Sequence, residues 1–103
     1  MKRVIVRYKA KPDRAAENIE YIKGVFAALE AGSPQGIRYA SFVGEDGVSF
    51  VHIASIETDD GSNPLAALEA FKAFQAEIGD RCEIPPEATW LNPEPIGDYG
   101  VFG

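Results

Sequence analysis

The sequence contains one cysteine, one histidine and one tryptophan, and these scarcities exclude several kinds of protein. A single cysteine, Cys82, cannot form an intramolecular disulfide, which favours a reducing, cytoplasmic setting. No cysteine or histidine is spaced to complete a metal site, so we expect no metal. The N-terminal segment has no apolar core of signal-peptide length, and no hydrophobic run approaches the roughly 18 residues that span a membrane. We therefore expect no membrane partner.

Positive charge is also scarce, because 10 Lys and Arg residues stand against 16 Asp and Glu residues, a formal net charge of −6. Nucleic acids bind clustered basic side chains, so we expect no nucleic-acid partner. With 103 residues, of which 46% are hydrophobic, the chain is long enough for one modest core and too short for two. We predict a single domain over residues 1–103, with residues 93–103 as a C-terminal tail rich in Pro and Gly.

What the sequence does contain is periodic. Alternating side chains predict strands over residues 3–10, 37–43 and 48–57, the last two joined through the turn residues Asp46 and Gly47. A short edge strand near residues 87–91 follows from flanking prolines, which sheets tolerate only at their edges.

Two helices separate these strands. Apolar residues at helical spacing predict the first helix from Pro12 to about residue 31. The second begins at Asn63 and Pro64, as N-cap and first helical residue, and ends at Gly79. The order of elements is that of the ferredoxin-like βαββαβ fold, an α+β class with a four-stranded antiparallel sheet and both helices on one face.

Both faces of this sheet carry apolar residues, although the helices cover only one. The simplest cover for the open face is a second copy of the chain, so we predict a homodimer. The helix side is predicted to hold Val4, Val6, Tyr8, Ile37, Tyr39, Val51 and Ile53. The open face is predicted to hold Ile5, Arg7, Lys9, Arg38, Phe42, Phe50, His52 and Ile56.

The stretch GVSFVHI, residues 47–53, has a second interpretation, because it partly matches the third strand of RNA-recognition domains. In that motif a basic residue precedes the glycine and aromatic residues alternate after it. Here Asp46 replaces the basic residue, and Val48 and Ile53 replace two aromatics. Without rings or positive charge little remains to hold a base, so we interpret the stretch as a structural wall.

His52 and the arginines are the candidates for chemistry. A lone histidine on an apolar strand is most often a hydrogen-bonded core residue, and the alternative is a polar anchor or general base in a cavity. An internal salt bridge is the commoner role for Arg7, and binding an anion is the alternative. Trp90 is an amphipathic anchor for a ligand or a subunit contact, unless it only packs the terminal segment.

Across most of its length the chain resembles the antibiotic-biosynthesis-monooxygenase-like group of dimeric α/β-barrel proteins. The resemblance rests on a Lys-Pro element closing the first strand, in VIVRYKAKPDR, a glycine opening the second, in PQGIRYASFV, and the hairpin that follows. It implies a ferredoxin-like protomer, a dimer whose sheets form one barrel, and a cavity between sheet and helices. Some members of the group oxidise aromatic substrates with dioxygen and no cofactor.

Two classes of function are consistent with the residues and the resemblance. One is an oxygenase without cofactor that acts on an aromatic or quinone-like molecule, with His52 as the catalytic base. In that case Arg7 or Arg38 holds an oxyanion, and Phe42 or Phe50 contacts the aromatic ring of the substrate. The other is a non-catalytic dimeric protein that binds a small molecule or takes part in a stress response.

Overall fold

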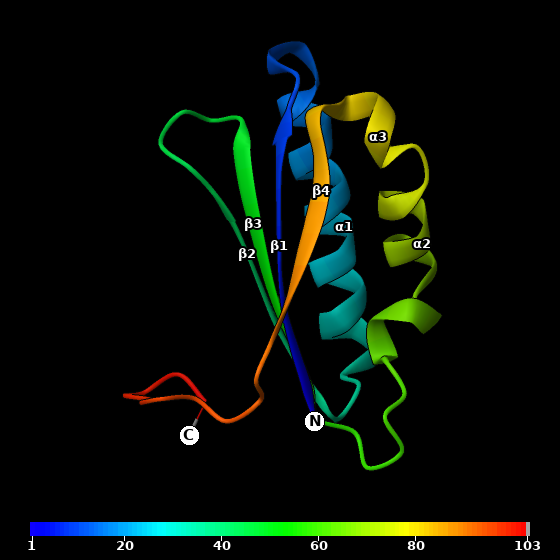
Figure 1. Ribbon diagram of the computed structural model, residues 1–103. Helices are drawn as coiled ribbons and strands as arrows, with labels where there is room; N and C mark the ends of the chain where they lie inside the picture. The colour runs from blue at the N-terminus through cyan, green and yellow to red at the C-terminus, as the bar shows by residue number, and fades with distance from the viewer. Residues whose placement is uncertain (103) are drawn as a thin grey trace.

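The computed structural model describes residues 1–102 and consists of one antiparallel sheet with helices against one of its faces (Figure 1). The four strands lie in the order β2-β3-β1-β4, which is the ferredoxin-like arrangement, and the predicted fold class is confirmed. Gly103 lies outside the described residues, so the predicted tail is described only from residue 93 to residue 102. The strands are β1 (Lys2–Ala10), β2 (Ile37–Val43), β3 (Ser49–Ile56) and β4 (Cys82–Leu91).

The first helix follows the prediction closely. A 3-10 turn over Pro12–Arg14 leads into α1 (Ala15–Gly32), which crosses the sheet on its helix side. Ala15 and Val25 of α1 are buried against a core that includes Tyr8 and Phe50 of the sheet. These apolar contacts hold the helix layer against the strands, because burial of apolar surface is the main force in such packing.

The second helix is not continuous, which corrects the predicted boundaries. Asn63 accepts a hydrogen bond from the Leu65 backbone N–H as expected of an N-cap, but it caps a separate 3-10 turn over Pro64–Ala67. Two short helices follow, α2 (Glu69–Gln75) and α3 (Ile78–Arg81). They are separated at Glu77, whose left-handed φ of 61° breaks the helical path. Gly79 lies inside α3 and does not end the helix.

The hairpin between β2 and β3 forms where Asp46 and Gly47 predict it. Gly47 has a φ of 74°, which glycine adopts without steric cost. The Asp46 carboxylate accepts hydrogen bonds from the backbone N–H groups of Val48 and Ser49. The turn therefore fixes the pairing of the two strands and places Val43 opposite Phe50.

That pairing reverses the two faces predicted for β3. Val6 lies on the helix side and pairs with His52, so His52 lies on the helix side as well. The faces predicted for Ile5, Arg7, Arg38 and Phe42 are consistent with the observed pairing. The residues predicted on the wrong face are Phe50, His52 and Ile56, which face the helices, and Val51 and Ile53, which lie on the open face.

The last strand is longer than predicted, since β4 begins at Cys82 rather than near residue 87. It lies at the sheet edge beside β1, as the prolines required. Pro85 and Pro86 fall in a part of β4 where the register against β1 shifts, so neither is needed as a ladder donor. Among residues 1–102, no helix has the length and apolar character to cross a membrane.

Candidate functional site

A cavity of about 450 Å³ lies between the helix side of the sheet and the helices, and we call it the site cavity. Its walls are mostly apolar side chains of β1, β3, β4, α2 and α3. Trp90 of β4 lies at its rim with 62% of its surface exposed. The lining residues used below are Tyr8, Tyr39, His52, Phe71, Phe74 and Trp90.

His52 forms the polar centre of this cavity, although its side chain is only 3% exposed. Its Nε2 lies 2.8 Å from the Tyr8 hydroxyl. Its Nδ1 lies 2.9 Å from the Tyr39 hydroxyl and 2.6 Å from the Ser41 hydroxyl. The rings of Tyr8 and Tyr39 stack on the imidazole at interplanar angles of 11° and 15°. Both ring nitrogens of the buried histidine are therefore satisfied by neutral hydroxyl groups.

The contacts continue behind Tyr8 into the helix layer. The side-chain N–H of Asn18 in α1 donates to the Tyr8 hydroxyl at 2.8 Å. The Nε–H of Arg81, the last residue of α3, donates to the side-chain oxygen Oδ1 of Asn18 at 3.2 Å. Asn18 is fully buried and Arg81 is 1% exposed, so the chain of contacts runs through the interior.

Burial controls the ionisation of this cluster. It lowers the pKa of His52 from its usual value to about 4, because desolvation disfavours the charged imidazolium. Burial also raises the pKa of Tyr8, against the opposing effect of the Asn18 hydrogen bond, and it raises the pKa of Tyr39. At neutral pH the cavity therefore contains an uncharged imidazole and two protonated phenols.

The five side chains predicted to form one site are divided between the two faces of the sheet. His52 and Phe50 lie on the helix side, where Phe50 is 2% exposed and packs on the ring of Tyr8. Arg7, Arg38 and Phe42 lie on the open face. Because the sheet separates these two groups, the arginines and His52 of one protomer do not converge on one ligand.

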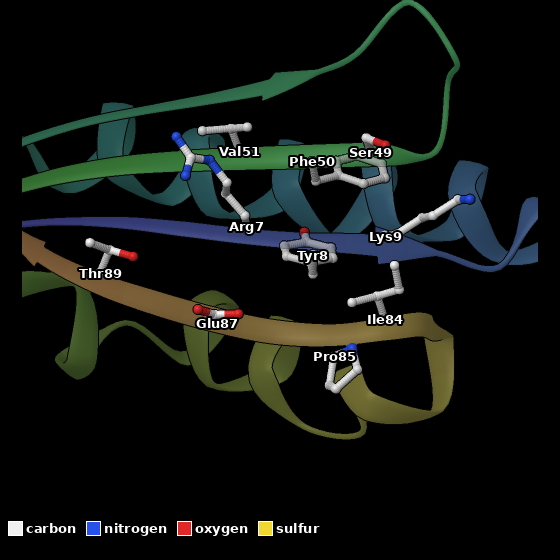
Figure 2. Close-up of a pocket in the computed structure, with 10 residues that line it drawn as sticks. All are labelled: Arg7, Tyr8, Lys9, Ser49, Phe50, Val51, Ile84, Pro85, Glu87 and Thr89. Atoms are coloured by element: carbon white, nitrogen blue, oxygen red, sulfur yellow. The ribbon is translucent and has the colours of Figure 1, made fainter.

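The open face has its own depression, a groove of about 340 Å³ (Figure 2). Figure 2 shows Arg7 of β1 between Val51 of β3 and Glu87 of β4, and Lys9 between Ser49 and Ile84, with the helices behind the sheet. Phe50 of β3 is drawn beside this groove, but its ring is 2% exposed and belongs to the core, so it offers no face on which a base could stack. The surface on which RNA-recognition domains stack bases thus lacks the ring that the sequence motif would supply.

Sequence reasoning missed most of the His52 cluster. The sequence predicts Tyr8 and Tyr39 on the helix side, and the observed register of β3 brings His52 between them. Asn18 gave a weak signal, a polar residue beside the apolar stripe of the first helix. No pattern in the sequence indicates that Arg81 belongs to the cluster. In the described part of the chain, no three His, Cys, Asp or Glu side chains are grouped so as to hold a metal ion.

Comparison with known proteins gives a result only at the level of structure. No protein-family model matches the chain, and no curated protein matches it. The structure of Rv0793 from Mycobacterium tuberculosis aligns with a TM-score of 0.73 at 18% identity, covering 97% of this chain and 98% of that chain. A crystal structure of an antibiotic biosynthesis monooxygenase aligns with a TM-score of 0.72 at 16% identity, covering 92% and 100%.

A third structure is described by its chemistry. It is a mutant of SnoaB, a cofactor-independent oxygenase from Streptomyces nogalater, with a TM-score of 0.66 and 15% identity over 94% of this chain and 97% of that chain. This chain has the fold of the antibiotic biosynthesis monooxygenase structures. The resemblance noted in the sequence is thereby confirmed for the fold.

The lowered pKa of His52 predicts how stability depends on pH. Between about pH 6.5 and pH 4 the unfolded chain binds a proton at His52 that the folded chain does not, so the free energy of unfolding falls as the pH falls. We expect a loss of about 1 kcal/mol per pH unit between pH 6 and pH 5. Urea unfolding at several pH values measures this slope.

Replacing His52 by glutamine provides the control, because the variant has no titrating group at this position and should lose the slope. A direct reading is available as well, since His52 is the only histidine and its Hε1 resonance is unambiguous. A titration midpoint near pH 6.5 in the folded protein would contradict the prediction.

Proposed function

We propose that this chain binds a small planar aromatic molecule in the site cavity and oxidises it with dioxygen, without a metal or organic cofactor. The observation that carries the proposal is the combination of a mostly apolar cavity with one buried, uncharged imidazole held by phenol hydroxyls. A volume of about 450 Å³ falls within the range of about 300–1,000 Å³ that is usual for small-molecule sites.

The walls favour a flat aromatic ligand. Phe71 and Phe74 lie edge-on or tilted to the stacked rings of Tyr39 and His52, so a planar ligand meets ring faces and edges within one cavity. Among residues 1–102, no Lys or Arg lines the site cavity. A bound oxyanion would therefore be stabilised by neutral donors, chiefly the hydroxyls of Tyr8 and Tyr39.

The proposed reaction starts with removal of a proton from a phenol. His52 is the proton acceptor, and the resulting electron-rich anion reduces dioxygen directly. The phenol loses two hydrogen atoms and gains one oxygen atom to become a quinone, and the second oxygen atom leaves with those hydrogens as water. Apolar walls exclude bulk water and strengthen the electrostatic interactions on which the anion depends.

The roles predicted for Arg7, Arg38 and Phe42 remain predictions, and they require a ligand on the open face. Arg38 is already paired with Glu57, its Nε lying 3.1 Å from the carboxylate. The site cavity is the better candidate because it contains the buried titratable group that the open face lacks.

A second candidate function is binding without catalysis. The observation that favours it is the state of His52, whose pKa near 4 makes it a weak base and whose two nitrogens already have partners. In this case the hydroxyl groups would orient a ligand that is carried or sensed rather than oxidised.

Replacing His52 by glutamine separates the two functions. Glutamine retains groups that can bond the hydroxyls but cannot serve as a base, so oxygen consumption with a dihydroxynaphthalene should fall by about 10²–10⁴-fold. Affinity should change little, and quenching of the fluorescence of Trp90, the only tryptophan, measures it at the rim of the cavity.

Lys72→Gln on the exposed surface of α2 is the matched control and should retain both properties. Parent and His52→Gln proteins that turn over the substrate equally fast would exclude the base role. A parent protein that binds the ligand without consuming oxygen would establish the second function instead.

We also propose that two copies of the chain pack through their open faces and form a barrel. Phe42 is 58% exposed on this face, beside the half-buried side chains of Ile5, Val51 and Ile53. An exposed apolar patch of this kind usually marks a contact surface, and a second copy presents the same complementary surface. The cytoplasmic setting stays a prediction, since it rests on the cysteine content alone.

Replacing Phe42 by glutamate should convert the dimer into a monomer, because a charge would be desolvated at the interface. Val43→Glu is the matched control, since Val43 is 44% exposed and lies on the other face of the same strand. Sedimentation at micromolar concentration distinguishes the species by comparison with the 11.2 kDa chain mass. A monomeric parent protein, or two variants that behave alike, would refute the proposed interface.

A further inference from the structure

Arg81 is a buried cation without an acidic partner. Its side chain is 1% exposed, and none of the ion pairs formed within residues 1–102 includes it. Its other N–H groups donate to the backbone carbonyl oxygens of Phe74, at 2.6 Å, and Ala76, at 3.4 Å, and the guanidinium lies 4.4 Å from the centre of the Tyr21 ring. Burying a charge in this way costs free energy, so we expect the contact between Arg81 and Asn18 to have a function.

That contact fixes the orientation of the Asn18 amide. A guanidinium has only donors, so the group that faces it must be the amide oxygen, which lies 3.2 Å from Nε. The amide nitrogen then faces Tyr8 at 2.8 Å and can only donate. Arg81 therefore compels the Tyr8 oxygen to accept a hydrogen bond from Asn18.

The Tyr8 hydroxyl proton is left with one partner. Within residues 1–102 the hydroxyl contacts only Asn18 and His52, and His52 Nε2 lies 2.8 Å away. A buried hydroxyl whose proton has no acceptor is unfavourable, so the Tyr8 O–H donates to Nε2. A neutral imidazole has one N–H, and here that N–H is on Nδ1, where Ser41 and Tyr39 oxygens lie at 2.6 and 2.9 Å.

We propose that Arg81 and Asn18 are positioning residues that fix the tautomer of His52, with the proton on Nδ1 and the basic lone pair on Nε2 directed at Tyr8. Hydrogen-bond donation then runs in one direction from Arg81 through Asn18 and Tyr8 to His52. The Nδ1–H of His52 donates to the hydroxyl oxygen of Tyr39 or to that of Ser41. In either case the Tyr39 hydroxyl proton is free to donate to a ligand in the site cavity.

This arrangement adds a route for the substrate proton to the proposed oxidation. The route rests on the proposed function, whereas the tautomer of His52 does not. Nε2 is covered by Tyr8, so a proton reaches His52 through the Tyr8 hydroxyl rather than directly. Tyr8 lines the site cavity, and its oxygen has a second lone pair for a ligand O–H beside the one used by Asn18. The ligand gives its proton to Tyr8 as Tyr8 passes its own to Nε2, and no net charge is left on Tyr8.

The tautomer is measured directly by nitrogen NMR of protein labelled with ¹⁵N-histidine at neutral pH, with no ligand or turnover required. His52 is the only histidine, so the spectrum of the untagged chain contains two ring nitrogens. Their couplings to the ring protons distinguish them, because Nε2 couples to both Hδ2 and Hε1. We expect the unprotonated signal at Nε2 and the protonated signal at Nδ1. The reverse assignment would overturn the proposal.

Asn18→Asp tests the origin of the tautomer. The introduced carboxylate has nearly the shape of the amide but can only accept hydrogen bonds. It therefore pairs with Arg81 and accepts a hydrogen bond from the Tyr8 hydroxyl. The Tyr8 oxygen must then accept from His52, and the unprotonated signal should move from Nε2 to Nδ1. Asn63→Asp is the matched control, because Asn63 also lines the site cavity, and aspartate caps a helix as well as asparagine does. Its spectrum should retain the parent tautomer.

If the Asn18→Asp variant has the same His52 tautomer as the parent protein, Asn18 and Arg81 do not have the role proposed for them. The parent spectrum alone still tests the tautomer if Asn18→Asp does not fold. Failure of the proposed oxidation would appear as absent oxygen consumption and would leave the spectrum unaffected, so the two failures are distinguishable. Where turnover occurs, Tyr8→Phe should lower kcat by about 10²–10⁴-fold with little change in ligand affinity.

Discussion

The hydrogen bonds that hold His52 beneath the helices, where burial keeps it uncharged, join elements from the whole chain. His52 of β3 is held by Tyr8 of β1 and by Tyr39 and Ser41 of β2, and Asn18 of α1 connects this group to α3. Each buried hydroxyl left without a partner would cost about 1–3 kcal/mol, so the cluster specifies one register of three strands against two helices. The same contacts leave a polar group at the centre of an apolar cavity, which makes the constraint on folding also the candidate site.

The order of elements and the fold class could be predicted because their signals are local. Alternation along residues 3–10 and 37–43, helical spacing after Pro12 and turn chemistry at Asp46 and Gly47 each depend on a few neighbouring residues. Boundaries in the second half were harder, because the helix breaks at Glu77, where no proline or glycine marks the break. Tertiary packing rather than propensity decided that segment.

The faces of β3 could not be predicted from its own pattern, because Phe50 and Ile56 are as apolar as Val51 and Ile53. The information lay in the turn. If Asp46 and Gly47 are its two central residues, then Glu45 opposes Val48 and the alternation places Val43 opposite Phe50, which is the observed pairing. The commoner role of a lone histidine, a hydrogen-bonded core residue, does not say which face of the strand it occupies, so it could not decide the register of β3. Arg81 joins the site only through the path of α3, which no local pattern of the sequence predicts.

The central claim is that ligands bind on the helix side of the sheet, at the hydroxyls around His52, and not on the open face with the arginines. A crystal structure of the protein soaked with a dihydroxynaphthalene tests it most directly. The account predicts an aromatic ring among Phe71, Phe74 and Trp90, with a ligand oxygen within hydrogen-bond distance of the Tyr8 or Tyr39 hydroxyl. A ligand bound instead in the groove of Arg7 and Lys9, with the site cavity filled by water, would contradict it.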